Sequence, residues 1–177
     1  MKILKLIFPV LFCIMLSSCG MISSVMEESD EYDPADIFAN DYPFAEETAL
    51  KVVDCLNESD EEGLKALLSE SVLSQEDVDA QIDELFDFYK GKSISHNEVR
   101  RNEASTESRD GRYVYKSLAI YVHQILTDEN ETYNLEFYYV VVDDDNPSRL
   151  GISRLWFRDE EGHIILRLFD EPENISK

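Results

Sequence analysis

Basic residues are scarce in this chain of 177 residues. Sixteen lysines and arginines stand against 38 aspartates and glutamates, which gives a formal net charge of −22 at pH 7 with neutral histidines. A surface so acidic repels phosphate backbones and anionic lipid headgroups. We therefore expect no nucleic-acid partner and no electrostatic docking to a membrane. The charge itself keeps a domain soluble and disfavours non-specific association.

Hydrophobic runs long enough to span a membrane are also lacking. The apolar run from Ile3 to Leu16 is shorter than the ~20 residues that a transmembrane helix needs. Lys2 and Lys5 give this segment a positive start, and the small residues Ser17 and Ser18 close it. A positive start, a short apolar run and small residues are typical of a secretory signal that is cleaved off.

The residue after this signal is Cys19. The sequence Leu16-Ser17-Ser18-Cys19 resembles the lipobox of bacterial lipoproteins. The resemblance implies a signal peptide over residues 1–18, cleavage between Ser18 and Cys19, and a diacylglyceryl group on Cys19. Two acyl chains are enough for stable anchoring, so the partner would be the outer face of a cell membrane, in a Gram-positive bacterium. An ordinary signal peptide followed by an unmodified cysteine is the alternative.

Cysteines are few. Of the three in the chain, Cys13 would leave with the signal and Cys19 would carry lipid, so only Cys55 would remain. An intramolecular disulfide is then excluded, and a secreted fold must depend on its core. Because Cys55 lies in a helical pattern with no Cys-His motif beside it, we expect a buried, inert thiol and not a nucleophile.

Residues 19–42 are small, polar and acidic. Loss of the two signal lysines leaves 14 − 38 = −24 charges on the processed chain. Self-repulsion and few apolar residues favour an extended, poorly ordered segment, so we expect a tether. Calcium binding is the alternative, but the acids lack the alternating spacing and central glycine of a calcium loop.

The remaining residues, 43–177, predict one α+β domain. Helical spacing of apolar residues follows Pro43, a second helix begins near Ser59, and a third ends before Gly91. Alternating segments then predict strands, which cover residues 94–103, 113–124, 133–142, 150–158 and 164–169. Short polar connections favour consecutive hairpins, so the helices should cover one face of an antiparallel meander. A doubly wound α/β fold is the weaker alternative, because no helices separate the strands.

The order of helices before an antiparallel sheet, with the break Asn57-Glu58-Ser59-Asp60 before a leucine-rich helix, resembles the nuclear transport factor 2-like, or cystatin-like, cone. The whole chain is also similar to an uncharacterised family of lipoproteins from Gram-positive anaerobes. The cone resemblance implies helices in the concave face of a curved sheet and a pocket between the two.

Six residues on the predicted strands are candidates to line that pocket. They are aromatic or basic, and comprise Tyr115, Tyr121, His123, Tyr139, Arg154 and Trp156. Alternation groups them by face within each strand, but does not show that the faces of different strands coincide. Such a pocket would suit a small or anionic ligand. An ordinary aromatic core with charged ends reaching water is the alternative.

Catalytic signatures are absent from the sequence. No G-x-S-x-G, P-loop, H-E-x-x-H or C-x-x-C motif occurs, and we expect no cofactor and no metal. We expect a lipoprotein that binds a small ligand or an envelope protein through an apolar patch or free sheet edge. The alternative is a small isomerase-, cyclase- or hydrolase-like enzyme of the cone fold, in which His123 lies in a cavity close to an acid.

Overall fold

The computed structural model describes residues 34–169, with side chains from Asp41 onward. The expected signal peptide, Ser18, Cys19 and residues 19–33 of the expected tether lie outside the described residues. Within residues 34–169, no helix combines the length and the apolarity that crossing a membrane requires.

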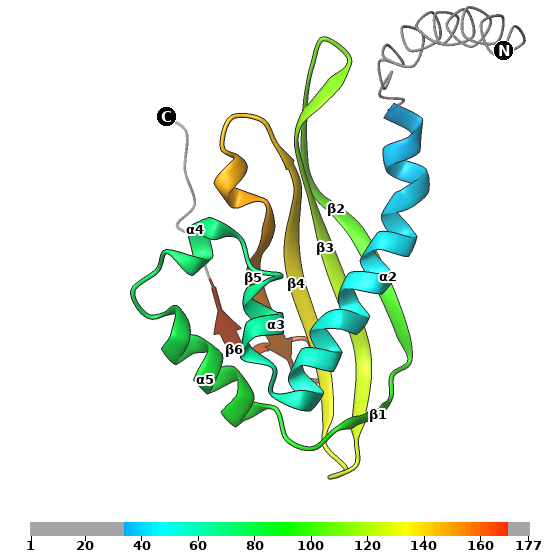
Figure 1. Cartoon of the computed structure of the whole chain (residues 1–177). Coiled ribbons are helices and arrows are strands. Elements are labelled where there is room, and N and C mark those ends of the chain that lie inside the picture. The colour runs from blue at the N-terminus through cyan, green and yellow to red at the C-terminus, as the bar shows by residue number, and fades with distance from the viewer. Residues whose placement is uncertain (1–33, 170–177) are drawn as a thin grey trace, which may run out of the picture. The chain divides into compact units, whose positions relative to one another are not determined.

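Helices precede strands, as the sequence predicts, and the fold is α+β (Figure 1). The helices are α2 (Pro34–Glu58), α3 (Glu61–Lys65), α4 (Glu70–Leu73) and α5 (Val78–Phe88). The strands are β1 (Ser93–Ser95), β2 (Glu98–Arg109), β3 (Arg112–Thr127), β4 (Thr132–Asp143), β5 (Gly151–Arg158) and β6 (Ile164–Leu168). A 3₁₀ turn, η1 (Pro147–Arg149), lies between β4 and β5.

The first helix begins earlier than the sequence predicts. Residues 34–42, expected in the tether, are helical, and Pro43 lies inside α2 and not in its first turn. Pro34 occupies the start instead, where the missing N–H costs nothing. Tertiary contact also favours the extension, because Asp41 on this part of α2 forms a buried ion pair with Lys116 of β3.

The other helices largely agree with the pattern. Asp60 caps α3 by accepting a hydrogen bond from the Gly63 N–H (3.0 Å), whereas Ser59 adopts a positive φ of 50°. The N-cap is therefore Asp60, the residue after Ser59, near which the sequence places the start of this helix. The predicted apolar face of α5 is confirmed, since Val78, Ile82 and Leu85 are buried.

All strand pairs are antiparallel, and the order β1-β3-β4-β5-β6, with β2 also on β3, confirms the meander. The sheet is curved and does not close into a barrel (Figure 1). β2 and β3 join at Asp110-Gly111, whose φ angles of 53° and 79° are those of a tight two-residue hairpin turn.

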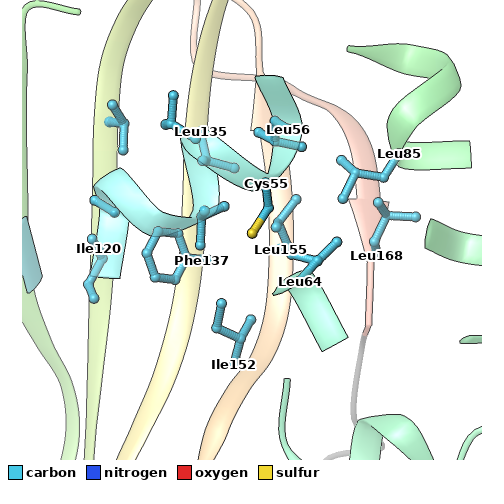
Figure 2. Close-up of a cluster of buried hydrophobic side chains, with 14 of the residues drawn as sticks. Cys55, Leu56, Leu64, Leu85, Ile120, Leu135, Phe137, Ile152, Leu155 and Leu168 are labelled. Carbon is cyan, nitrogen blue, oxygen red and sulfur yellow. The ribbon is translucent and has the colours of Figure 1, made fainter. Parts of the chain in front are cut away.

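The helices cover one face of this sheet, which we call the covered face. It is apolar: Cys55, Leu56 and Leu64 from the helices meet Ile120, Leu135, Phe137 and Leu155 from the strands (Figure 2). Register aligns these strand residues, because Phe137 pairs with both Ile120 and Leu155. Cys55 is a free, buried cysteine as predicted, and burial raises the pKa of its thiol.

Two backbone hydrogen bonds attach the link between α3 and α4 to β5. The Ser69 N–H donates to the Ile152 carbonyl (3.0 Å), and the Ile152 N–H donates to the Leu67 carbonyl (2.8 Å). The backbones approach so closely that a Cβ on Gly151, whose φ is 119°, would lie 2.9 Å from the Ser69 nitrogen. Glycine is therefore required at this position.

Candidate functional site on the open face of the sheet

The face opposite the helices, which we call the open face, carries five of the six candidate residues. Register places them there, since Tyr121 pairs with Glu136, and Glu136 with Trp156. The five are Tyr115, Tyr121, His123, Arg154 and Trp156. Tyr139 lies on the covered face, where its ring meets that of Phe44 edge-on at 5.0 Å. The structure therefore does not bring Tyr139 together with the other five.

Glu136 lies at the centre of the open face. Its side chain is buried, and Arg158 Nε donates a hydrogen bond to Oε2. Burial, followed by the charge of Glu136 and a hydrogen bond to it, raises the pKa of Tyr121. Burial and the same carboxylate raise the pKa of Tyr138 to about 12. One guanidinium thus balances the charge of a buried acid, and two phenols lie beside it.

Trp156 lies beside this group. Its ring contacts Arg167 (4.7 Å to the guanidinium carbon), Arg158 (5.4 Å) and the ring of Tyr138 (5.1 Å). Cations over the indole face are favourable. Its buried Nε1 has no hydrogen-bond partner among the described residues. The aromatic surface around Trp156 is therefore a packed platform, in which each ring contacts another ring or a guanidinium group.

A groove of about 600 Å³ indents the open face at one end of this platform, and we call it the His123 groove. It lies where β2, β3 and β4 meet the turn between β5 and β6. Its walls are polar and comprise Asn97, Glu98, Arg100, His123, Gln124, Asn134, Arg158, Asp159, Glu160 and Gly162.

Charges of both signs face this groove. His123 is half-buried and lies directly opposite Glu98 across the β2–β3 pair. Glu98 pairs with Arg100 at 2.6 Å. No hydrogen bond between the His123 ring and an acid is present within the described residues. The groove can therefore supply donors, acceptors and charge, but an assembled His–carboxylate pair is not formed in this state.

A smaller hollow of about 170 Å³ lies farther along the same face, and we call it the Arg154 pocket. Its walls are Ala104, Ser105, Tyr115, Ser117, Tyr138, Arg149, Ser153 and Arg154. Of the five candidates on the open face, His123 lines the groove and Tyr115 and Arg154 line the pocket. Tyr121 and Trp156 are in the lining of neither hollow.

The turn between β5 and β6 holds the group of three potential metal ligands found among the described side chains. Ligand atoms of Asp159, Glu161 and His163 lie within 4.8 Å of one another. The His163 N–H donates to Asp159 Oδ1 (2.7 Å), and the ring Nδ1 lies 3.1 Å from Oδ2. Burial alone would raise the pKa of Asp159, but these hydrogen bonds outweigh it and lower that pKa. These hydrogen bonds between His163 and Asp159 are enough to explain why the three side chains lie together: they stabilise the turn.

The acidic run after β4 is likewise a turn held by arginines. Asp144 pairs with Arg112, and Asp145 Oδ2 lies 2.6 Å from Arg109 Nη2. The Asp143 carboxylate, which is buried, accepts a hydrogen bond from the Asn146 N–H (2.8 Å). A polar hairpin connection, as the sequence predicts, accounts for all three acids.

Sequence reasoning missed two arginines, one in the wall of each hollow. Arg158 lines the groove and holds Glu136, and Arg149 lines the pocket. One signal was present: Glu136 stands in the apolar stretch Leu135-Glu136-Phe137. A charge in the middle of a predicted central strand indicates a buried and paired group.

Residues 51–161, more than half of the chain, match a family described as a domain of unknown function, DUF5104. The chain belongs to this family. The match spans the C-terminal end of α2, the strands from β1 to β5, and every residue that lines the Arg154 pocket. No curated protein matches the sequence. The function of this DUF5104 protein must therefore be argued from its own site.

Proposed function

We propose that this protein is a lipid-anchored extracytoplasmic binding module, and that a small polar ligand binds in the His123 groove. The observation that carries the proposal is the groove itself: about 600 Å³ of polar-walled space on the face that the helices leave uncovered. Concave sites with a few placed polar groups are the usual location of small ligands.

The wall chemistry points to a ligand that carries both charges. His123, Arg100 and Arg158 can meet a carboxylate, and Asp159 and Glu160 can meet an ammonium group. The amides of the groove suit peptide-like donors and acceptors. We therefore propose zwitterions of the size of an amino acid or dipeptide as the ligand class.

Isothermal titration calorimetry of the full-length protein with a panel of amino acids and dipeptides tests this proposal. A dicarboxylate and a polyamine serve as ligands of a single charge sign. We expect saturable binding by zwitterionic members, weakened at least tenfold by His123→Ala. His96→Ala removes an exposed histidine outside the groove and should leave affinity within twofold. Absence of binding by every panel member, or equal weakening by both variants, would overturn the proposal.

Anchoring rests on the sequence around Cys19. A positive start, a short apolar run and small residues before the cysteine support cleavage after Ser18 and lipidation of Cys19. Metabolic labelling of the host with a tagged fatty acid should label the wild-type protein and not Cys19→Ala. Label retained on Cys19→Ala would contradict the anchor.

The fold supports the cone resemblance in outline, since helices cover one face of a curved antiparallel sheet. We propose that the chain is a variant of the nuclear transport factor 2-like cone. In this variant the candidate site lies on the open face, away from the helices. Superposition on an experimental structure of this chain would test the assignment.

One observation favours a second candidate function, a small enzyme. Glu98 is the cross-strand neighbour of His123, and both line the groove. Rotation of Glu98 away from Arg100 would create an acid–base pair. NMR spectra of a bound panel member over time separate the two functions. With a binding module, no new product signals appear in the ligand spectrum over time. With an enzyme, product signals grow over time, and His123→Ala abolishes this conversion.

An envelope protein remains the other expected partner. β6 ends the strand order of the sheet, and Ile164 and Ile165 on it are exposed. Edge strands with apolar side chains are sites where another chain can pair. Crosslinking in intact cells, with Ile165→Lys as the variant that should abolish it, tests this route independently of the groove.

A further inference from the structure

We propose that Arg158 binds a free carboxylate of the ligand in the His123 groove, and that the buried Glu136 is the positioning residue for its guanidinium group. The assignment rests on the proposed function and gives the bound ligand an orientation. It makes a free carboxylate, such as the C-terminus of a peptide, a requirement for binding. Because Glu136 already balances the charge of Arg158, recognition depends on the orientation of the N–H groups and not on net charge.

The guanidinium group of Arg158 is held by several contacts at once. Its Nε donates a hydrogen bond to Glu136 Oε2, and its Nη1 donates to the Gly162 carbonyl (2.8 Å). The flat face of the group lies over Trp156, with 5.4 Å between the guanidinium carbon and the ring. Among the described residues these hydrogen bonds leave the N–H groups of Nη2 for a ligand in the groove that Arg158 lines. A planar fork in a fixed orientation matches the oxygens of a carboxylate.

Glu136 can hold this position because it is itself fixed. It is buried on β4, directly opposite Trp156 across the β4–β5 pair. Tyr121 and Tyr138 lie beside its carboxylate. Packing on all these sides restricts the carboxylate to the place where Arg158 meets it. A buried group that fixes the orientation of a binding group prepares a site before the ligand arrives.

The other arginine of the groove is held less firmly. The Arg100 side chain is 63% exposed and pairs with Glu98, which is also exposed. The Arg158 side chain is 29% exposed, and its acid is buried. An exposed ion pair holds its side chains weakly. Ordering a loose side chain on binding costs entropy that a fixed one has already lost, so Arg158 is the better carboxylate site.

Two ligands that differ only in the carboxylate test this assignment on the wild-type, full-length protein. Alanylalanine has a free carboxylate, and alanylalanine amide has a neutral amide in its place. In titration calorimetry we expect the amide to bind at least tenfold more weakly than alanylalanine. Equal affinities would overturn the role of Arg158 and leave the groove in place as a binding site. Binding of neither probe would also overturn that role, and only absence of binding across the whole panel would overturn the proposed function as well.

Trp156, the single tryptophan of the chain, provides a second readout in the wild type. Its ring lies against the guanidinium group of Arg158. A ligand carboxylate on Arg158 should therefore change the Trp156 fluorescence saturably, with the midpoint that calorimetry gives for alanylalanine. Saturable binding in calorimetry without a change in fluorescence would place the carboxylate elsewhere in the groove and overturn the assignment.

Variants of Glu136 separate positioning from charge. Glu136→Asp keeps the negative charge but shortens the side chain by one methylene, so it no longer reaches Arg158 Nε. Glu136→Gln keeps the length and an acceptor oxygen but removes the charge. Positioning predicts that Glu136→Asp weakens alanylalanine binding at least fivefold and that Glu136→Gln stays within threefold of the wild type. Unchanged binding by Glu136→Asp together with tighter binding by Glu136→Gln would show a charge effect alone and overturn positioning.

Variants of two arginines on the same indole provide the matched control. Arg158→Lys keeps the charge and loses the fork, and it should weaken alanylalanine binding at least tenfold but amide binding less than twofold. Arg167 also lies over Trp156 (4.7 Å) but outside the groove wall, so Arg167→Lys should bind as the wild type does. Equal weakening by both variants would overturn the assignment. Circular dichroism verifies the fold of each variant, and the wild-type comparison of the two ligands decides if a variant does not fold.

Discussion

The two faces of the sheet are made by alternate residues of the same strands, yet their chemistry is opposite. On β4, Leu135 and Phe137 point into the covered face and are fully buried among apolar side chains. Glu136 between them is equally buried, but it is enclosed by phenols and a guanidinium. Burial alone therefore does not define the core of this protein. The covered face stabilises the fold, whereas the open face holds charge in fixed geometry.

The largest expected effect comes from the ion pair beneath α2. Both carboxylate oxygens of Asp41 lie within 2.8 Å of Lys116 Nζ. Lys116→Ala leaves that carboxylate buried with only Arg101, at 3.5 Å. Removing one partner of a buried pair costs about 3–5 kcal/mol, and urea unfolding should show a loss near the lower end. Lys92→Ala, which breaks an exposed pair with Glu58, should leave stability nearly unchanged. Similar losses for both variants would contradict a specific role for the buried pair.

Adjacent residues on β4 test the contrast between the faces. Leu135→Ala should lower the free energy of unfolding by about 2–5 kcal/mol, because it opens a cavity in the covered face. Asn134→Ala, on the open face, removes the acceptor for the Gln124 N–H (3.0 Å) and a long donation to the Asp159 carbonyl (3.4 Å), and should cost about 1 kcal/mol. Equal losses in chemical denaturation would remove the distinction between the faces.

A substitution where β5 approaches the link between α3 and α4 should cause a smaller loss of stability. In Gly151→Ala the new Cβ meets backbone atoms of residues 67–69 at a φ of 119°, so we expect a loss of about 1–3 kcal/mol. Gly111→Ala has positive φ but open space around it. It should cost about 1 kcal/mol or less. The difference in thermal stability between the two variants measures the cost of the contact between a Cβ at position 151 and the backbone of residues 67–69. A larger loss of stability in Gly111→Ala than in Gly151→Ala would contradict this explanation.

Burial of Tyr138 on the open face, beside Glu136, should appear in the alkaline pH dependence of stability. The pKa of Tyr138 is raised from 10 to about 12 in the folded state. Between these values the unfolded chain binds fewer protons than the folded chain, so stability falls as pH rises from 10 to 12. Tyr138→Phe should make this fall shallower, as measured by urea unfolding across that range. An unchanged slope would contradict the raised pKa of Tyr138 in the folded state.

Local patterns predicted most of the strands and their antiparallel order, but the segment predicted as one strand over residues 94–103 forms two, β1 (Ser93–Ser95) and β2 (Glu98–Arg109). Alternation and short polar connections depend on neighbouring residues, and these features predicted the antiparallel meander that the structure shows. The register between neighbouring strands could not be predicted from such local patterns. The six-residue candidate group required Tyr139 and Tyr121 to share a face, and the observed register places Tyr121 opposite Glu136 instead. Register is a property of a pair of strands, and one sequence leaves it open.

Long-range pairs were also beyond local patterns. Asp41 and Lys116 are 75 residues apart, and neither position shows that the other will be its partner. The sequence therefore predicted that the first helix starts at Pro43. In the structure α2 begins at Pro34, and the buried ion pair of Asp41 favours this longer helix. The apolar neighbours of Lys116 on its face of β3 were the available signal, since a buried lysine must be paired.

Ring NMR signals of the histidines test the central claim, that the open face binds ligand, most directly. The chain has three histidines: His123 lies in the groove, His163 lies in the turn beside it, and His96 is exposed outside it. During titration of the full-length protein with the dipeptide that binds most tightly, the His123 signals should shift saturably while those of His96 stay in place. Saturable binding that leaves His123 unmoved would contradict the account.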